Sequence, residues 1–230
     1  PGYDFVIQAM SGMMALTGEP DGDPMKHGLS ISDLSCGLWS ANAVQAALLM
    51  RQRTGSGQWI DMSLLDCAVA VTANQAMNYL STGRAPGLMG NAHVNLAPYQ
   101  VFDCADGYII IATGNDAQYR RLCDLLALPE LGPDPRFATN ADRLDHRETL
   151  TELLGAATAR WAKADLLAAC EAQGVPAGPI NDMAEVMADP QVQARGMQIE
   201  ADGVPGVRSP FRFSGADLAL GKGAPKLGES

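Results

Sequence analysis

Apolar residues recur at helical spacing in the first 80 residues. The stretch 3–16 ends before TGEPDGDP, whose glycines and prolines predict a loop over 17–32. From Leu34 to Arg53 the spacing is helical again, with apolar side chains tending to one face and Gly55 as a stop. After it, QWIDMSLLDCAVAVTANQAMNYL predicts a short strand or turn that runs into another apolar helix.

The middle of the chain changes from a turn-rich segment to regular patterns. Residues 81–98 are rich in Gly, Pro and Asn, which predicts a linker. Two strand-like runs follow, YQVFDC and YIIIAT, separated by the turn ADG. Three helical patterns come next, in AQYRRLCDLLAL, RETLTELLGAATARW and KADLLAACEAQG. Residues 99–178 are therefore predicted to form a small α/β domain.

The last part of the chain is irregular. A second linker begins around VPAGPI, and residues 179–230 contain short strand-like runs such as FRFSG. We expect this segment to fold back onto the helical piece, residues 1–80, so that both belong to one larger domain. The predicted fold class is α/β.

Charge and hydropathy narrow the function. The 26 acidic residues outnumber the 16 Lys and Arg, and a net charge of −10 argues against a nucleic-acid-binding face. No run approaches the roughly 18 apolar residues of a membrane span. We therefore expect neither nucleic acid nor membrane as a partner.

Cysteine and histidine spacing carries no metal signature. The three histidines have no HxH or HxxxH spacing, so we predict no zinc site. The five cysteines are odd in number and form no CxxC pair, which favours reduced thiols and a cytoplasmic protein. They are Cys36, Cys67, Cys104, Cys123 and Cys170.

One carboxylate stands where the polar loop becomes the long helix. Asp33, in ISDLSCG, has two interpretations. Asp is a favoured helix cap, because its side chain accepts hydrogen bonds from free N–H groups. The same N–H groups and the helix dipole keep a carboxylate ionised, and an ionised carboxylate can attack an activated acyl carbon.

Several longer motifs occur in order along the chain. They are PGYDFVIQAMSGMMALTGEPDGDP, SDLSCGLWSANAVQAALLMRQRTGSGQWIDMSLLD, GNAHVNLAPYQVFDCADGYIIIATGN, PDPRFATNADRLDHR, RSPFRFSG and the APKLGES end. With these motifs the chain resembles the family III CoA-transferases, which act on formyl-, carnitinyl- or succinyl-CoA and include the α-methylacyl-CoA racemases. The resemblance implies that family's fold, with a partial large domain, a small α/β domain and an interlocked homodimer in complete members.

The resemblance makes Asp33 the nucleophile. It implies that Asp33 attacks an acyl-CoA thioester, giving a mixed anhydride and CoA thiolate, and that the thiolate then converts the anhydride to an aspartyl-CoA thioester. An incoming carboxylic acid reverses these steps and leaves as the new acyl-CoA. The partners are thus an acyl-CoA and a small carboxylic acid, and no metal or redox cofactor is implied.

Tyr3 and Asp4 separate the transferase from the racemase. The racemase branch has a His where this chain has Tyr3, and a phenol with a pKa near 10 is a poor replacement for that base. Tyr3 instead matches an aromatic residue that lines the CoA and acyl site of transferases, and Asp4 matches an acidic residue beside it in the formyl-CoA branch. The alternative for Tyr3 is simple packing at a helix start.

The linker indicates the branch. The formyl-CoA branch has consecutive glycines after Gly-Asn-Ala, whereas this chain has HVNLAPYQ, which is more similar to the succinyl-CoA or citramalate and mesaconate branch. His93 and Asn95 are then candidates to meet substrate oxygens or shield the intermediate, with Gln100 nearby. The alternatives are loop residues that tie the linker by hydrogen bonds and, for Gln100, an exposed strand residue.

The resemblance also bears on completeness. Family members begin with a nucleotide-binding-like α/β segment and end with a further helical stretch, and we expect this chain to lack both. A racemase-like enzyme and an inactive dimerisation or binding module remain alternatives to an active transferase.

Overall fold

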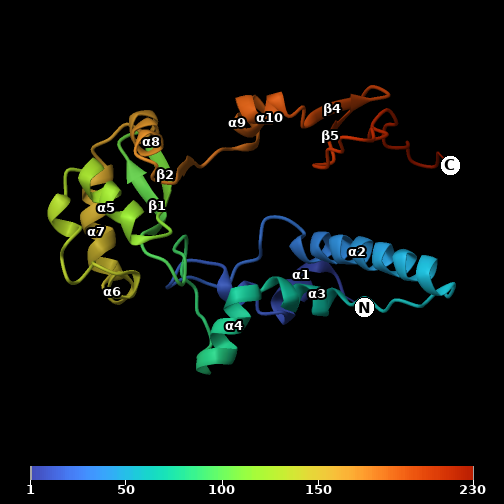
Figure 1. The fold of residues 1–230 in the computed structure, drawn as a ribbon, viewed down its shortest axis with the longest axis horizontal. Helices are drawn as coiled ribbons and strands as arrows, with labels where there is room; N and C mark the ends of the chain where they lie inside the picture. Colours follow the sequence, from blue (N-terminus) through green and yellow to red (C-terminus); the bar gives the residue numbers. More distant parts are fainter. Residues whose placement is uncertain (1, 230) are drawn as a thin grey trace.

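The computed structural model describes residues 2–229 and contains three regions (Figure 1). A helical region at the start, a small α/β region in the middle and an extended C-terminal arm follow one another along the chain. The predicted divisions after residues 80, 98 and 178 stay a prediction, and residues 1 and 230 lie outside the described part.

The first predicted helix is interrupted. Helix α1 spans Asp4–Met10, and a separate 3-10 turn, η1, spans Met14–Leu16. Gly12 lies between them with φ +87°, a left-handed conformation that ends a helix and that glycine adopts without strain. The prediction of one helix over 3–16 was therefore wrong in its middle.

The long second helix begins earlier than predicted. Helix α2 spans Ile31–Thr54, so it starts three residues before Leu34. It ends as predicted at Gly55, which has φ +76° and donates its N–H to the carbonyl of Arg51 (2.8 Å).

The next helical pattern is divided in two, and no strand precedes it within residues 55–63. Helix α3 spans Leu64–Val71 and helix α4 spans Ala73–Thr82. Ala73, at the junction, has φ +42°, which breaks the helical path. Helix α3 packs on α2 and α1.

The small α/β region is built on an antiparallel hairpin. Strand β1 (Tyr99–Cys104) pairs with β2 (Gly107–Ala112), as the two strand-like runs predicted. Strand β3 (Ala177–Pro179) adds to β2, although the sequence suggested a linker there. The helices around this sheet are α5 (Asp116–Leu125), η2 (Pro129–Leu131), α6 (Asn140–Asp145), α7 (Arg147–Thr158) and α8 (Lys163–Ala172).

This region contains the main hydrophobic core. Ile109 and Ile111 alternate along β2 with more exposed neighbours and are fully buried. They belong to one cluster with buried side chains of α5, α7 and α8, among them Leu122, Leu154 and Leu166. The core therefore gives the linker beside β1 a rigid support.

The C-terminal arm holds two short helices and a small hairpin. The helices are α9 (Met183–Ala188) and α10 (Pro190–Ala194), and the strands are β4 (Gln198–Ala201) and β5 (Val204–Val207). The run FRFSG, predicted as a strand, has no regular structure. The hairpin forms before it, because Asp202 and Gly203 both take positive φ and close the tight turn.

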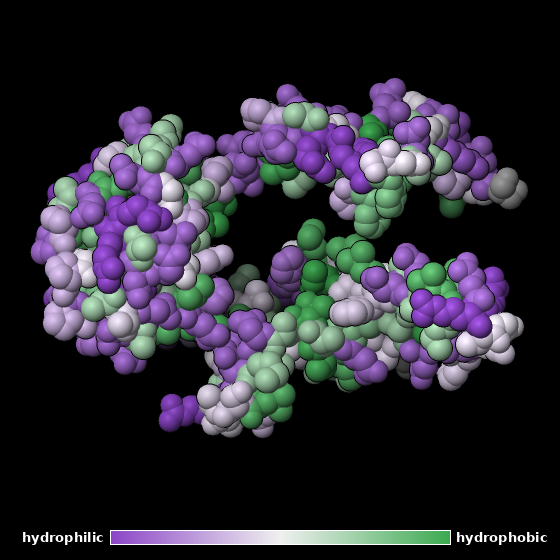
Figure 2. All heavy atoms as spheres, viewed as in Figure 1, coloured by the Kyte–Doolittle hydropathy of each residue, from purple (hydrophilic) through white to green (hydrophobic). Residues whose placement is uncertain are grey.

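Helix α2 leaves much of its apolar surface uncovered. Leu38 is 66% exposed and Trp39 is 51% exposed, and other apolar side chains along the helix are similar. In Figure 2 hydrophobic atoms gather on the side of the helical region that faces the C-terminal arm. Such an apolar surface is typical of a helix that is covered in a larger assembly.

Candidate active site

Asp33 lies within the first turn of α2 and points to solvent. It is the third residue of the helix, and its side chain is exposed. Within residues 2–229 its carboxylate makes neither a hydrogen bond nor an ion pair. The helix-cap interpretation of Asp33 was therefore wrong, and the carboxylate is free to react at the positive end of a 24-residue helix.

Asp4 performs the capping instead. The Ser32 N–H donates to Oδ1 of Asp4 (2.8 Å), and Nε2 of Gln8 donates to Oδ2 (2.7 Å). Burial raises the pKa of Asp4, but these hydrogen bonds outweigh it and hold the pKa below its ordinary value. A carboxylate from α1 thus satisfies a free N–H group one residue before Asp33.

Gln8 completes this connection and was missed by sequence reasoning. Its side chain is fully buried, its Nε2 also lies 3.3 Å from the Leu29 carbonyl, and its Oε1 accepts the His27 N–H (2.8 Å). The loop that leads into α2 is therefore fastened to α1. Helical spacing gave no signal for this role, since it marks apolar positions only.

We predict that Asp4→Asn lowers the free energy of unfolding by about 1 kcal/mol at neutral pH, as for loss of a helix cap. An amide can still accept from Ser32, but Asn cannot accept from Gln8 with its NH₂ group. Because the folded-state pKa is lowered, the wild-type advantage is present above the unfolded pKa near 3.9 and disappears as pH falls through the folded pKa.

Urea unfolding of both proteins at pH 7 and near pH 3 measures this effect. Asp21→Asn is the control, since Asp21 is exposed in the preceding loop. An Asp4→Asn effect of equal size at both pH values would contradict the assignment.

Tyr3 lies directly before α1. Its side chain is 85% exposed, and its carbonyl accepts the Ile7 N–H (3.1 Å). The structure thus places Tyr3 next to Asp4 in sequence and leaves its ring uncovered. The alternative that the Tyr3 ring packs at the helix start is therefore not supported within residues 2–229.

His93 and Asn95 lie together in the linker. The Asn95 N–H donates to Nδ1 of His93 (3.1 Å), and the His93 ring lies 4.9 Å from the Tyr99 ring between centroids. The Asn95 side chain exchanges hydrogen bonds of 3.3 and 3.5 Å with Asn78 of α4. The hydrogen bonds expected for a tied linker are therefore present.

Gln100 lies in a different environment. Its Oε1 accepts from the Thr151 hydroxyl of α7 (3.3 Å), so it is not simply an exposed strand residue. It lines a hollow of about 410 Å³ together with Glu19, Asn91 and Tyr108. Within residues 2–229, no hydrogen bond joins Asp33 to Tyr3, His93, Asn95 or Gln100, so these residues form separate local groups.

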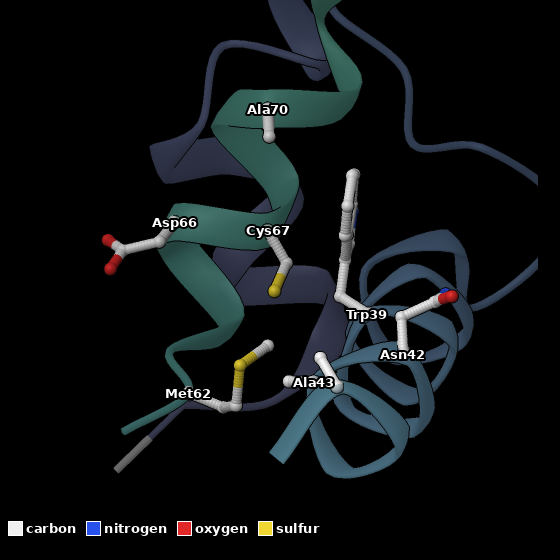
Figure 3. Close-up of a pocket in the computed structure, with 8 residues that line it drawn as sticks. Trp39, Asn42, Ala43, Met62, Asp66, Cys67 and Ala70 are labelled. Atoms are coloured by element: carbon white, nitrogen blue, oxygen red, sulfur yellow. The ribbon is translucent and has the colours of Figure 1, made fainter. Parts of the chain in front are cut away.

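An apolar hollow of about 450 Å³ lies between α2 and α3 (Figure 3). Trp39 stands beside α3, the Cys67 sulfur points toward the hollow, and Met62 lies at its edge. The lining contains no Lys, Arg or His. Because CoA phosphates and substrate carboxylates need donors or positive charge, we do not assign this hollow to the substrate.

The next features are the grouping of metal-ligating side chains and the apolarity of the helices. Among residues 2–229, no three His, Cys, Asp or Glu side chains are grouped so as to hold a metal ion. In the same part of the chain, no helix is both long enough and apolar enough to cross a bilayer. The five cysteines are free thiols.

Comparison with known proteins places the chain in a family. The sequence model described as CoA-transferase family III matches residues 1–230. The chain belongs to the family III CoA-transferases. This confirms the resemblance inferred from the ordered motifs.

Relatives of this CoA-transferase family III chain are similar over nearly all of it. The succinate–glutarate CoA-transferase of Agrobacterium fabrum is 49% identical over 99% of this chain, and the acetyl-CoA:oxalate CoA-transferase of Acetobacter aceti is 41% identical over 100%. A crystal structure of a CAIB/BAIF family protein from Brucella suis has 57% identity and a TM-score of 0.83 over 98% of the chain.

The chain is shorter than the relatives that it matches. It spans 58% and 59% of the two relatives' lengths and 60% of the Brucella chain. The predicted family fold is confirmed by the structural match. The name of the Agrobacterium protein agrees with the predicted succinyl-CoA branch.

Proposed function

We propose that this chain supplies the nucleophile of a CoA-transferase that moves CoA from an acyl-CoA to a small carboxylic acid. The observation that carries the proposal is the state of Asp33, whose carboxylate is exposed and unpaired while Asp4 caps the helix. A residue needed only for capping would be engaged with the helix N–H groups.

The reaction proceeds in two halves. An oxygen of Asp33 attacks the thioester carbonyl, the C–S bond breaks, and CoA leaves as a thiolate. The thiolate attacks the aspartyl carbonyl of the mixed anhydride, the acyl carboxylate leaves, and an aspartyl-CoA thioester remains. An acceptor carboxylate then attacks this thioester, the C–S bond breaks, and a mixed anhydride of Asp33 with the acceptor forms as the CoA thiolate leaves. The thiolate attacks the acyl carbon of the acceptor, the bond from that carbon to the Asp33 oxygen breaks, and Asp33 returns as a carboxylate while the new acyl-CoA leaves.

The structure supports the first step through charge and access. Asp33 lies at the N-terminal end of a long helix, where the helix dipole favours negative charge, and its exposed oxygens are accessible to a thioester. The cap from Asp4 fixes the helix end without occupying the Asp33 oxygens. The remaining work is to hold thiolate and acid in place and to exclude water.

Tyr3, Asp4, His93, Asn95 and Gln100 are proposed to bind or shield the substrates. Exposed Tyr3 offers an aromatic surface to the acyl-CoA, and His93 with Asn95 offers hydrogen bonds to acyl or carboxylate oxygens. Asp4 already lies beside the start of α2, whereas His93, Asn95 and Gln100 form separate local groups, and we propose a homodimer in which these groups contribute to one site. The exposed apolar side of α2 supports such an assembly. The free thiols support a cytoplasmic location.

The first substrates to test are succinyl-CoA as donor and glutarate as acceptor. They are suggested by the name of the Agrobacterium relative, whereas the Acetobacter relative suggests acetyl-CoA and oxalate. Purified protein is incubated with each pair, and the acyl-CoA species are separated by chromatography. We expect glutaryl-CoA from the first pair; absence of any new acyl-CoA from both pairs, with folded protein, would contradict the proposed function.

A further inference from the structure

Four consecutive carbonyls of the linker are bound by side chains from the small α/β region. Arg147 Nη2 donates to the carbonyl of Val94 (3.3 Å) and its Nη1 to that of Leu96 (3.4 Å). Asn140 Nδ2 donates to the Asn95 carbonyl (2.9 Å). Arg143 Nε donates to the Ala97 carbonyl (2.6 Å).

We name Asn140, Arg143 and Arg147 the carbonyl clamp. Asn140 and Arg143 belong to α6, Arg147 is the first residue of α7, and all three lie in the motif TNADRLDHR. Asn140 also accepts the Ala97 N–H with Oδ1 (3.2 Å), so its amide holds both of the peptide groups that flank Leu96.

The carbonyl clamp binds the linker backbone with charged guanidinium donors. Ala97 is buried, so its carbonyl needs a protein donor, but Val94 and Leu96 are only partly buried and their carbonyls are nevertheless bound by the guanidinium group of Arg147. Arg147 is half-buried, and burial lowers its pKa. Arg147 forms no ion pair with any residue from 2 to 229. Its side-chain hydrogen bonds within that range go to the linker carbonyls of Val94 and Leu96.

The clamped backbone has a direct chemical consequence at His93. Since Nδ1 of His93 accepts the Asn95 N–H, the neutral ring must carry its proton on Nε2. Nε2 is then a hydrogen-bond donor. A shift of the Val94–Asn95 peptide would break this arrangement and release the ring.

We propose that the carbonyl clamp positions His93 and Asn95 for the acyl or carboxylate oxygens of the substrate. Asn140, Arg143 and Arg147 are positioning residues, since each acts through the linker backbone. This inference rests on the proposed transferase function. It explains why the linker, although made of glycine- and proline-rich sequence on one side, presents a single defined backbone at residues 94–97.

Arg147→Met is the decisive variant, because Arg147 touches only carbonyls and its loss removes no amide partner. We expect the amides of Asn95 and Ala97 to exchange with deuterium about tenfold faster or more than in the wild-type chain. Arg147→Lys, which keeps one charged donor, should restore part of this protection. Arg160→Met is the matched control, because Arg160 is an exposed arginine just after the same helix.

The nitrogen spectrum of the His93 ring supplies a second, activity-independent measurement. The wild-type chain should show the tautomer protonated on Nε2, and Arg147→Met should show a mixture of tautomers. Unchanged exchange at Asn95 and Ala97 together with an unchanged His93 tautomer would overturn the clamp, whether or not the chain is active.

Steady-state kinetics then test positioning. If the wild-type chain forms glutaryl-CoA, the Arg147→Met variant should have a kcat roughly 10- to 100-fold lower than the wild type, as expected for misplaced binding groups. Its thermal unfolding midpoint should be unchanged. A loosened linker with full kcat would overturn the positioning role. A wild-type chain without turnover would instead count against the proposed function, and the exchange and tautomer results would still decide the clamp.

Discussion

The Asp33→Asn protein is expected to form no covalent intermediate with an acyl-CoA, and its transfer rate should fall by at least about a thousandfold. Asparagine has the same shape but offers no carboxylate oxygen to attack the thioester. No described hydrogen bond or ion pair of residues 2–229 depends on the Asp33 carboxylate, so the fold should be unchanged. Hydroxylamine trapping after incubation with succinyl-CoA, followed by peptide mass spectrometry, measures the intermediate.

Asp66→Asn is a closely matched control. Asp66 is also exposed and is also the third residue of its helix, α3, so the two carboxylates hold the same position relative to a helix N-terminus. A general effect of removing negative charge at a helix start would appear in both variants. An Asp33→Asn protein that still yields a hydroxamate at residue 33, or yields one elsewhere, would show that the nucleophile has been assigned to the wrong residue.

The role of Asp33 illustrates what local sequence could not supply. The pattern ISDLSCG predicted that a helix begins here, although the start was placed three residues too late, and it favoured Asp33 as the cap. The cap comes from Asp4, and only the folded chain brings these residues together. The longer family motifs favoured a nucleophilic role for Asp33, which stays a prediction, because they extend well beyond the local capping pattern.

The fold was predictable where apolar strand-like runs are separated by residues that favour a tight turn. The two runs around ADG were predicted as strands, and they pair in the hairpin β1–β2, from Tyr99 opposite Ala112 to Cys104 opposite Gly107. In the arm, the aromatic residues Phe211 and Phe213 suggested a strand, but they lie in irregular structure. The Asp202–Gly203 pair was the stronger signal, since both residues can take the positive φ of a tight hairpin turn.

Helix α2 shows a different limit of pattern analysis. Its apolar positions predicted a helix with one face directed to a core, and the helix is present. Leu34, Leu38 and Leu49 nevertheless remain more than half exposed. Hydrophobic spacing therefore records where burial is needed, and residues 2–229 provide only part of that burial.

Arg143→Met is expected to lower the free energy of unfolding of the small α/β region by about 3–5 kcal/mol. The Arg143 side chain is only 1% exposed and donates to the carbonyls of Ala97 and Phe137. Methionine fills a similar volume but leaves both carbonyls without this donor. The variant also loses the contact between the guanidinium group and the Tyr119 ring, 4.5 Å from its centroid, which contributes about 1 kcal/mol.

The ion pair to Asp116 is expected to contribute little to that loss. The Asp116 side chain is 42% exposed, so water can replace the guanidinium group when Arg143 is removed. The stabilisation therefore resides in the buried end of Arg143, where its donors meet backbone carbonyls that water reaches poorly.

Arg136→Met separates these contributions. Arg136 also pairs with an aspartate, Asp134 at 2.7 Å, and also lies over an aromatic ring, that of Phe137 at 5.0 Å, but its side chain is 53% exposed. Its removal should change the free energy of unfolding far less than removal of Arg143, as measured by urea unfolding followed by circular dichroism. Equal losses in the two variants would contradict the argument, because charge pairing and ring contact are common to both arginines and only burial with its carbonyl partners distinguishes Arg143.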